Sequence, residues 1–98
     1  MVILPKPITF EWDKGNSDKN WIKHKIADKE CEEPFFDQQK KIIEDVRHSE
    51  NEQRFLLFGQ TKLSRLVVIV FTIRHNRVRV ISARNINKKE KTIYEKAS

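Results

Sequence analysis

The hydrophobic pattern is strongest near the C-terminus, where it predicts a β-hairpin. Residues 65–74 form an almost unbroken run of Val, Ile, Leu and Phe, which is typical of a strand buried on both faces. The run is short and rich in β-branched residues, and both properties favour a strand over a buried helix. Residues 77–84 predict the second arm, and His75-Asn76 is the two-residue loop because Asn accepts a positive φ. Alternation along the second arm places Val78, Val80, Ser82 and Arg84 on one face and Arg79, Ile81 and Ala83 on the other.

The N-terminal third carries shorter patterns. Residues 8–12 alternate enough to predict a first strand, and a cluster of turn-forming residues follows it. Asn16 or Ser17 can cap a short helix over residues 18–25. Two apolar side chains of that helix are expected to anchor it to the sheet, namely Trp21 and Ile22.

A second short helix is predicted over residues 29–33, reaching as far as Phe36. Acidic residues in its first turns suit the positive end of the helix dipole. Pro34 lies late in this segment and should kink or tighten its end. Residues 41–44 and 54–58 then predict two strands on either side of a polar loop.

The C-terminal end predicts a helix over residues 88–96, because Asn87 and Glu90 have the spacing of a capping box. The predicted order is therefore β-α-α-β-β-β-β-α. This order indicates an α+β fold with a mostly antiparallel sheet, two short N-terminal helices and a C-terminal helix. The chain length suits one domain over residues 1–98, with residues 1–7 as a loose leader.

Charge is distributed unevenly along the chain. The net charge is +6, yet residues 65–98 hold nine Lys or Arg against two acids, and residues 28–53 hold nine acids against four Lys or Arg. A basic end suggests a polyanionic partner such as nucleic acid. The single cysteine, Cys31, excludes an internal disulfide and favours a reducing cytoplasm. No apolar run is long enough for a transmembrane helix, and the N-terminus is too short for a signal peptide.

A set of short motifs runs through nearly the whole chain. They are Phe10-Glu-Trp-Asp13, Asn20-x-x-Lys23-His24, Phe36-Asp37, Asp45-x-x-His48-Ser49-x-x-Glu52-x-Arg54, Gly59-x-Thr61, Arg65-Leu66 and Arg79-Val-Ile-Ser-Ala-Arg84, followed by Glu90 and Tyr94. In this order and spacing the sequence resembles the BrnT family. The departures fall at turns and a helix end: His75 and Ser64 stand where the family often has Gly, and Pro34 stands where an aliphatic residue is usual.

The resemblance implies a ribonuclease toxin of a bacterial type II toxin–antitoxin module, with a fold related to RelE. It also implies a co-encoded BrnA-type antitoxin that binds operator DNA, and a toxin–antitoxin hetero-oligomer. Such a toxin would be a metal-independent endoribonuclease that inhibits translation by cutting RNA, leaving 2′,3′-cyclic phosphate or 3′-phosphate ends. No cofactor is implied.

Cleavage of RNA without a metal needs a base, an acid and cations that stabilise the charge growing on the phosphate. Arginine suits the last role because its planar fork can bind two phosphate oxygens. The arginine candidates lie on or beside the predicted strands, and some of them could instead be partners for acidic residues: they are Arg54, Arg65, Arg79 and Arg84. His24 and His48 are acid–base candidates because histidine titrates near neutrality. Glu52 could be a base or could orient Arg54, which is the role we favour, and Lys23 is a candidate phosphate contact.

The sequence also raises three alternatives: a metal site, base stacking by tryptophan and a non-catalytic function. The three histidines and Cys31 show no ligand spacing, so a metal site is not predicted. Trp12 and Trp21 could stack on bases, although packing in the core is the simpler interpretation. A non-catalytic nucleic-acid-binding protein of the same fold would carry the same basic patches as a ribonuclease. RNA cleavage by the purified protein in EDTA separates the ribonuclease from the non-catalytic nucleic-acid-binding protein.

Overall fold

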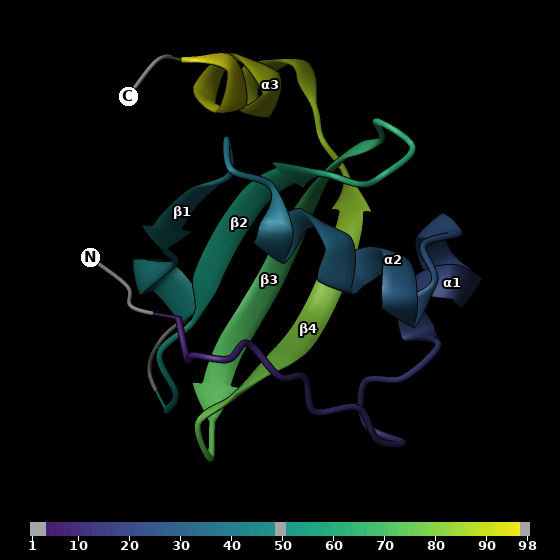
Figure 1. The fold of residues 1–98 in the computed structure, drawn as a ribbon, viewed down its shortest axis with the longest axis vertical. Helices are drawn as coiled ribbons and strands as arrows, with labels where there is room; N and C mark the ends of the chain where they lie inside the picture. Colours follow the sequence, from purple (N-terminus) through teal and green to yellow (C-terminus); the bar gives the residue numbers. More distant parts are fainter. Residues whose placement is uncertain (1–3, 49–50, 97–98) are drawn as a thin grey trace.

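The computed structural model describes residues 4–48 and 51–96, apart from the side chain of His48 (Figure 1). Its elements, in chain order, are α1 (Lys19–His24), α2 (Asp28–Glu32), the 3-10 helix η1 (Glu33–Phe36), β1 (Lys41–Glu44), the 3-10 helix η2 (Val46–His48), β2 (Phe55–Gln60), β3 (Leu66–Arg74), β4 (Arg77–Asn85) and α3 (Lys88–Glu95). The predicted α+β class, with its antiparallel sheet and C-terminal helix, is confirmed. Within the described residues, no helix combines the length and the apolar character needed to cross a membrane.

The sheet follows chain order, β1-β2-β3-β4, and each strand is antiparallel to its neighbour. The predicted hairpin is β3 and β4, the two longest strands. Its turn residues His75 and Asn76 both have positive φ, 54° and 60°, and Ser64 in the preceding turn has a φ of 66°. The left-handed region favours glycine, so these conformations explain why Gly would suit the positions of His75 and Ser64.

One face of the sheet carries the main core. Alternate side chains of β2, β3 and β4 point to this face, where α2, η1 and the N-terminal segment cover them (Figure 1). The covering segments contribute Ile26, Cys31 and Phe35. The buried sheet residues of this cluster are Phe55, Leu57, Val67, Ile69, Phe71, Val78, Val80 and Ala83. Burial raises the pKa of the Cys31 thiol to about 12, so this thiol is a packing group rather than a nucleophile.

A β-bulge in β4 changes which side chains share a face. Val70 pairs with Ser82 and Phe71 pairs with Val80, so Ile81 is an extra residue in the ladder. Beyond the bulge the alternation is shifted, and Ala83 joins Val80 in the core while Ser82 is exposed. The prediction that Ser82 shares a face with Val80 was therefore wrong, because strict alternation does not anticipate an extra residue.

The predicted first strand, residues 8–12, is not a strand of the sheet. It forms a single parallel bridge, between Phe10 and Val78, through two backbone bonds: Glu11 N donates to Val78 O and Val78 N donates to Thr9 O, each at 2.8 Å. An alternating pattern fits an extended segment laid along a strand edge as well as a full strand. The segment nevertheless covers part of the outer edge of β4.

Helix α1 has the position predicted for it but a different anchor. Trp21 is 49% exposed and Ile22 is 75% exposed, so the expectation that they pack on the sheet was wrong. Asn20 is the buried residue of α1, and its Oδ1 accepts a 2.9 Å hydrogen bond from Ala83 N on β4. A buried amide serves here because the open strand edge needs an acceptor for its N–H group.

The second helix tightens at its end, as predicted from Pro34. Helix α2 passes directly into η1, with Pro34 in the first turn of the 3-10 segment. Pro34 packs on Gly59 of β2: a Cβ at Gly59 would lie 2.8 Å from Pro34 Cβ and 3.2 Å from Pro34 O. The absence of a side chain at Gly59 thus lets η1 approach the sheet.

Replacing Gly59 with alanine is expected to lower the free energy of unfolding by about 1–3 kcal/mol, because the new methyl group overpacks a rigid contact. Gly15→Ala is the matched control. Its Cβ would also meet an atom at 2.6 Å, but that atom is Nη2 at the far end of the long Arg79 side chain, which can shift more easily than the proline ring and backbone of Pro34. Neither glycine has a positive φ, so urea denaturation compares steric effects alone. Equal losses in the two variants would contradict the rigid contact at Pro34.

The opposite face of the sheet is covered at one end by α3. Asn87 and Glu90 form the predicted capping box: Asn87 Oδ1 accepts from Glu90 N at 2.8 Å, and Glu90 Oε1 accepts from Asn87 N at 3.1 Å. The Tyr94 hydroxyl donates to Asp37 Oδ2 at 2.7 Å, joining α3 to the segment after η1. Burial, with Asp37 beside it, raises the pKa of Tyr94 to about 12. Ala97, which the helical pattern predicts on the same side as Ile93 and Tyr94, lies outside the described residues.

Candidate functional site

Arg79 lies in a cluster of ion pairs near the turn of the β3–β4 hairpin. Its Nη1 is 2.9 Å from both Glu11 Oε1 and Asp13 Oδ2, and its Nη2 is 2.9 Å from Asp13 Oδ1. The guanidinium holds the pKa of Asp13 below its usual value, and the Arg79 side chain is only 13% exposed. These contacts commit Arg79 to fastening the N-terminal segment to β4.

Glu52 belongs to the same end of the sheet. Its two carboxylate oxygens each accept a 2.9 Å hydrogen bond from Arg74, one from Nε and one from Nη2. The hydrogen bonds with Arg74 lower the pKa of Glu52, and the charges of Arg54 and Arg79 lower it further. Because its carboxylate is stabilised in the charged form, Glu52 is a weak proton acceptor.

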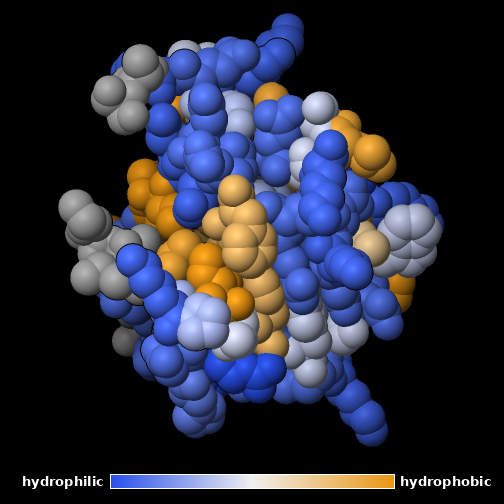
Figure 2. Space-filling view, in the orientation of Figure 1, coloured by the Kyte–Doolittle hydropathy of each residue, from blue (hydrophilic) through white to orange (hydrophobic). Residues whose placement is uncertain are grey.

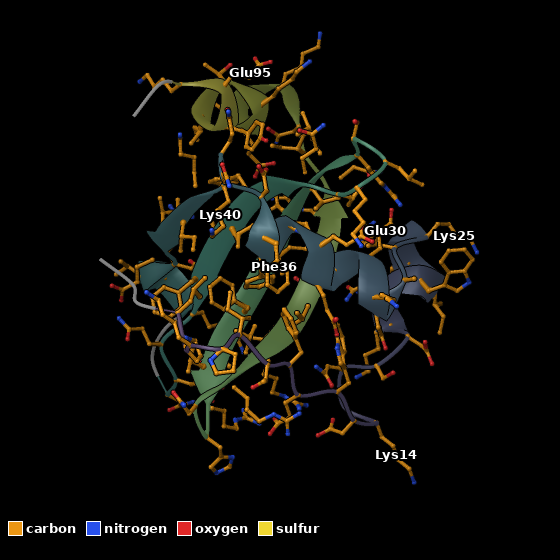
Figure 3. All side chains as sticks on the ribbon, in the orientation of Figure 1. Lys14, Lys25, Glu30, Phe36, Lys40 and Glu95 are labelled. Carbon is orange, nitrogen blue, oxygen red and sulfur yellow. The ribbon has the colours of Figure 1, made fainter. Side chains whose placement is uncertain are left out.

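Arg65 binds the backbone at the C-terminal end of α1. Its Nη2 donates to His24 O and its Nη1 to Lys25 O, both at 2.8 Å, and its Nε donates to Asn85 Oδ1 at 2.8 Å. Glu30 of α2 lies 3.5 Å from Nη1, and Figure 3 shows Lys25 and Glu30 at this junction of the two helices. All three guanidinium nitrogens of Arg65 are thus engaged by the protein itself.

Arg84 is held differently, on the outer face of β4. Its Nη1 donates to Glu90 Oε1 at 2.8 Å and to Asn85 O at 3.3 Å, while its Nη2 donates to Glu90 Oε2 at 2.6 Å. This end-on pair leaves the Nε–H and the second Nη2–H, the side-on fork, without a partner among the described residues. The Arg84 side chain is 43% exposed, so it is not enclosed by the protein. The bonds from Arg84 lower the pKa of Glu90, which keeps the orienting carboxylate charged.

Lys23 and His24 are exposed on α1, and neither side chain has a hydrogen-bond or ion-pair partner in the described part of the chain. His24 is the last residue of the helix, where Arg65 holds its carbonyl oxygen. The side chain of His48 is outside the described structure, so only its place at the end of η2 is known.

A groove of about 380 Å³ runs between α1 and β4. It forms because Asn20 spans the gap between the helix and the strand edge, and because the bulge turns Ile81 and Ser82 toward it. Its lining residues are Lys19, Asn20, Ile22, Lys23, Ile81 and Ser82. Both charged lining residues are lysines. Arg84 follows Ser82 by two positions on the same face of β4, so cations flank this part of the strand on two sides.

A larger hollow of about 500 Å³ lies between the α2–η1 segment and the β2–β3 turn. Three carboxylates, those of Glu32, Glu33 and Asp37, line it together with Lys29 and Lys62. The α1–β4 groove is the better candidate for a polyanion, because carboxylates repel phosphate.

The structure divides the sequence-derived candidates into two groups. Arg54, Arg79 and Glu52 lie at the hairpin-turn end of the sheet, close enough for both arginines to lower the pKa of Glu52. Lys23, His24 and Arg65 lie around α1 at the other end, and Arg84 faces the opposite side of the sheet from the core. Arg65, Arg79 and Arg84 therefore do not converge on a single point.

Two residues of this region were missed from the sequence. Arg74 is the partner of Glu52, although the chain separates them by 22 positions. Lys19 lines the groove with Lys23, and their spacing of four residues on a predicted helix was an available signal. No group of three His, Cys, Asp or Glu side chains suited to a metal ion occurs among the residues that the structure describes.

Comparison with known proteins gives one family. Residues 12–90 match the family described as the ribonuclease toxin, BrnT, of type II toxin–antitoxin systems. No curated protein matches the chain. The matched range includes α1, the whole sheet, Arg84 and Glu90. Since the match covers most of the chain, this protein belongs to the BrnT family of ribonuclease toxins of type II toxin–antitoxin systems.

Proposed function

We propose that this protein is a metal-independent endoribonuclease, acting in the cytoplasm, that inhibits translation by cutting RNA beside the α1–β4 groove. The observation that carries the proposal is the geometry of Arg84: Glu90 binds its guanidinium end-on, the side-on fork keeps its donors, and the side chain is 43% exposed. Such a fork matches two oxygens of one phosphate. Lys23 lines the groove with Ser82, two positions before Arg84 on β4, and adds a second positive charge.

The reaction is a transesterification at phosphorus that is accompanied by two proton transfers. The 2′-oxygen forms a bond to phosphorus while the bond from phosphorus to the 5′-oxygen breaks, giving a 2′,3′-cyclic phosphate. A base takes the proton of the 2′-hydroxyl, and an acid gives a proton to the departing 5′-oxygen. Arg84 and Lys23 offset the charge that grows on the phosphate oxygens. We assign the role of base to His24, because Glu52 is a weak base while it is bound to Arg74, and a water molecule supplies the proton to the departing 5′-oxygen.

The purified protein is expected to cut single-stranded RNA at an undiminished rate in EDTA and to release 2′,3′-cyclic phosphate or 3′-phosphate ends. Lysine and arginine can stabilise the phosphate charge that a metal ion would otherwise stabilise. End-group analysis of a labelled RNA provides the measurement. Loss of cleavage in EDTA, with recovery after Mg²⁺ is added, would refute the mechanism.

A non-catalytic nucleic-acid-binding protein is the second candidate function. It is favoured by the intramolecular contacts of Arg65, Arg79 and Glu52, which leave fewer groups for chemistry. RNA binding without cleavage in the same assay would establish it.

We further propose that a co-encoded BrnA-type antitoxin, itself an operator-DNA-binding protein, inhibits the toxin by covering the surface around residues 65–84. Charge complementarity would speed association, and buried arginines would anchor the complex. Acidic or aromatic antitoxin residues are therefore expected at this surface, with antitoxin dimerisation building the hetero-oligomer.

Co-purification with the protein of the neighbouring reading frame, followed by hydrogen-exchange mapping, is expected to show protection of residues 65–84. Cleavage should be lost in parallel, since the inhibitor would occupy the RNA site. Protection confined to the acidic segment 28–53, with residues 65–84 still exchanging freely, would contradict occlusion.

A further inference from the structure

The α1–β4 groove has cationic and apolar residues beyond those that we assign to the cleavage step. Lys19 and Lys23 stand one helical turn apart on α1, about 6 Å along its axis. This separation is comparable to that between successive phosphates of an extended single strand. Neither lysine has a side-chain partner within the described residues, so both ammonium groups are available to a ligand.

Apolar surface lies between these cations. Ile22 is 75% exposed on α1, and Ile81 is half-buried on the opposite wall at the bulge. Exposed apolar groups flanked by cations suit a nucleobase, which presents flat apolar faces between two phosphates. The exposed hydroxyl of Ser82, which has no partner among the described residues, can donate to or accept from a base edge or a 2′-hydroxyl.

The groove is built by fixed contacts. Asn16 Nδ2 donates to Val80 O at 2.9 Å on one side of the bulge, and Asn20 Oδ1 accepts from Ala83 N at 2.9 Å on the other. Both asparagines are buried, so they hold the strand edge and the helix at a set separation. The volume of about 380 Å³ falls within the range of about 300–1,000 Å³ typical of small-ligand sites.

We propose that this groove binds one unpaired nucleotide of the RNA substrate, next to the cleaved phosphate. The base packs between Ile22 and Ile81, Ser82 bonds its polar edge or its ribose, and Lys19 and Lys23 bind the phosphates on either side. The assignment rests on the proposed ribonuclease function and adds a reason for preferring single strands. A base paired within a duplex cannot enter a groove between a helix and a strand edge.

Binding is tested with a single-stranded RNA whose 2′-oxygens are methylated, so that it cannot be cut. Fluorescence anisotropy is expected to show about fivefold weaker binding for Lys19→Gln, and a salt dependence reduced by about 0.7 in log–log slope. Lys88→Gln is the matched control, because Lys88 is an equally charged and exposed residue on α3. Equal effects of the two substitutions would overturn the proposal.

Contact with the base is tested by Ile22→Ala in combination with RNAs that each lack one base. The truncation is expected to weaken binding to intact RNA about fivefold. At one position, loss of the base should weaken wild-type binding and cancel the effect of Ile22→Ala. If the losses of affinity from Ile22→Ala and from base removal add up at every position, the proposal is overturned. It is also overturned if binding of an acidic peptide depends on Lys19 while binding of RNA does not.

Cleavage of unmodified RNA by the wild-type protein tests the ribonuclease function separately from the nucleotide site. If it cuts RNA but shows neither binding result, the nucleotide assignment is wrong and the ribonuclease function stands. If both binding results hold and no RNA is cut, the groove remains a nucleotide site and the proposed catalysis is wrong.

Discussion

Replacing Arg84 with lysine is expected to slow RNA cleavage about 100-fold while the protein remains folded. Lysine keeps the positive charge but is a point donor, so it cannot bind two phosphate oxygens through a planar fork. The Nε–H and Nη2–H that form this fork are the donors that Glu90 and Asn85 leave unused. The rate of a single turnover at saturating protein is the measurement, because it isolates the chemical step from RNA binding.

Folding should survive this substitution. The Arg84 side chain is 43% exposed, so water screens its pair with Glu90, and such pairs contribute about 0–1 kcal/mol. Arg47→Lys is the matched control, since Arg47 is an exposed arginine on η2 that the proposed site does not include. Glu90→Gln should give a smaller loss, because the amide can still accept from Arg84 but no longer fixes it by charge. Wild-type cleavage by a stable Arg84→Lys protein would show that the fork does not bind the reacting phosphate.

Local patterns were sufficient to predict most of the fold. The hairpin, the strand over residues 41–44, the tightening at Pro34 and the Asn87–Glu90 capping box all depend on residues close together in the chain, and all are confirmed. The errors occurred where a distant element decides the outcome. Residues 8–12 lie along β4 with a single bridge, and no local pattern distinguishes this arrangement from a full strand.

Helix α1 shows a second limit of hydrophobic patterning. Its buried anchor is Asn20, a polar residue, because β4 presents an N–H group that must be satisfied. Trp21 and Ile22 were expected inside and are exposed, and Ile22 instead forms a wall of the groove. Hydropathy identifies a packing residue only when the surface opposite it is apolar.

The candidate site was the least predictable part. Its residue types followed from charge, but the partners of each arginine depend on the fold: Arg79 pairs with Asp13 across 66 positions, and Arg65 reaches His24 O across 41. By contrast, the apolar patch that Figure 2 shows lies over β1 and η1, two segments that are close together in the sequence. Spacing alone could not tell a structural arginine from one with free donors.

Arg65 shows why that distinction matters for function. Helix α1 has six residues, too few to be stable alone, and its last carbonyl groups have no partner within the helix. The residue after it, Lys25, is in the left-handed conformation with a φ of 58°, so the chain turns sharply there. The Arg65 guanidinium binds the carbonyls of His24 and Lys25 at this turn and places a positive charge at the negative end of the helix dipole.

Replacing Arg65 with alanine is therefore expected to lower the free energy of unfolding by about 2 kcal/mol and to release α1 from the sheet. Hydrogen exchange should accelerate more at residues 19–26 than in β2 and β3, where only the lower global stability acts because their ladder does not involve the guanidinium. Cleavage should fall as α1 loses its order, because Lys23 and His24 lose their positions. Arg65→Lys should recover part of the stability and part of the cleavage rate, because it keeps the positive charge. Thr92→Ala, on the exposed side of α3, is the control for a substitution without such contacts to another element. If instead Arg65→Ala abolished cleavage while α1 kept its normal exchange, Arg65 would have to act on the RNA directly rather than through the helix that it holds.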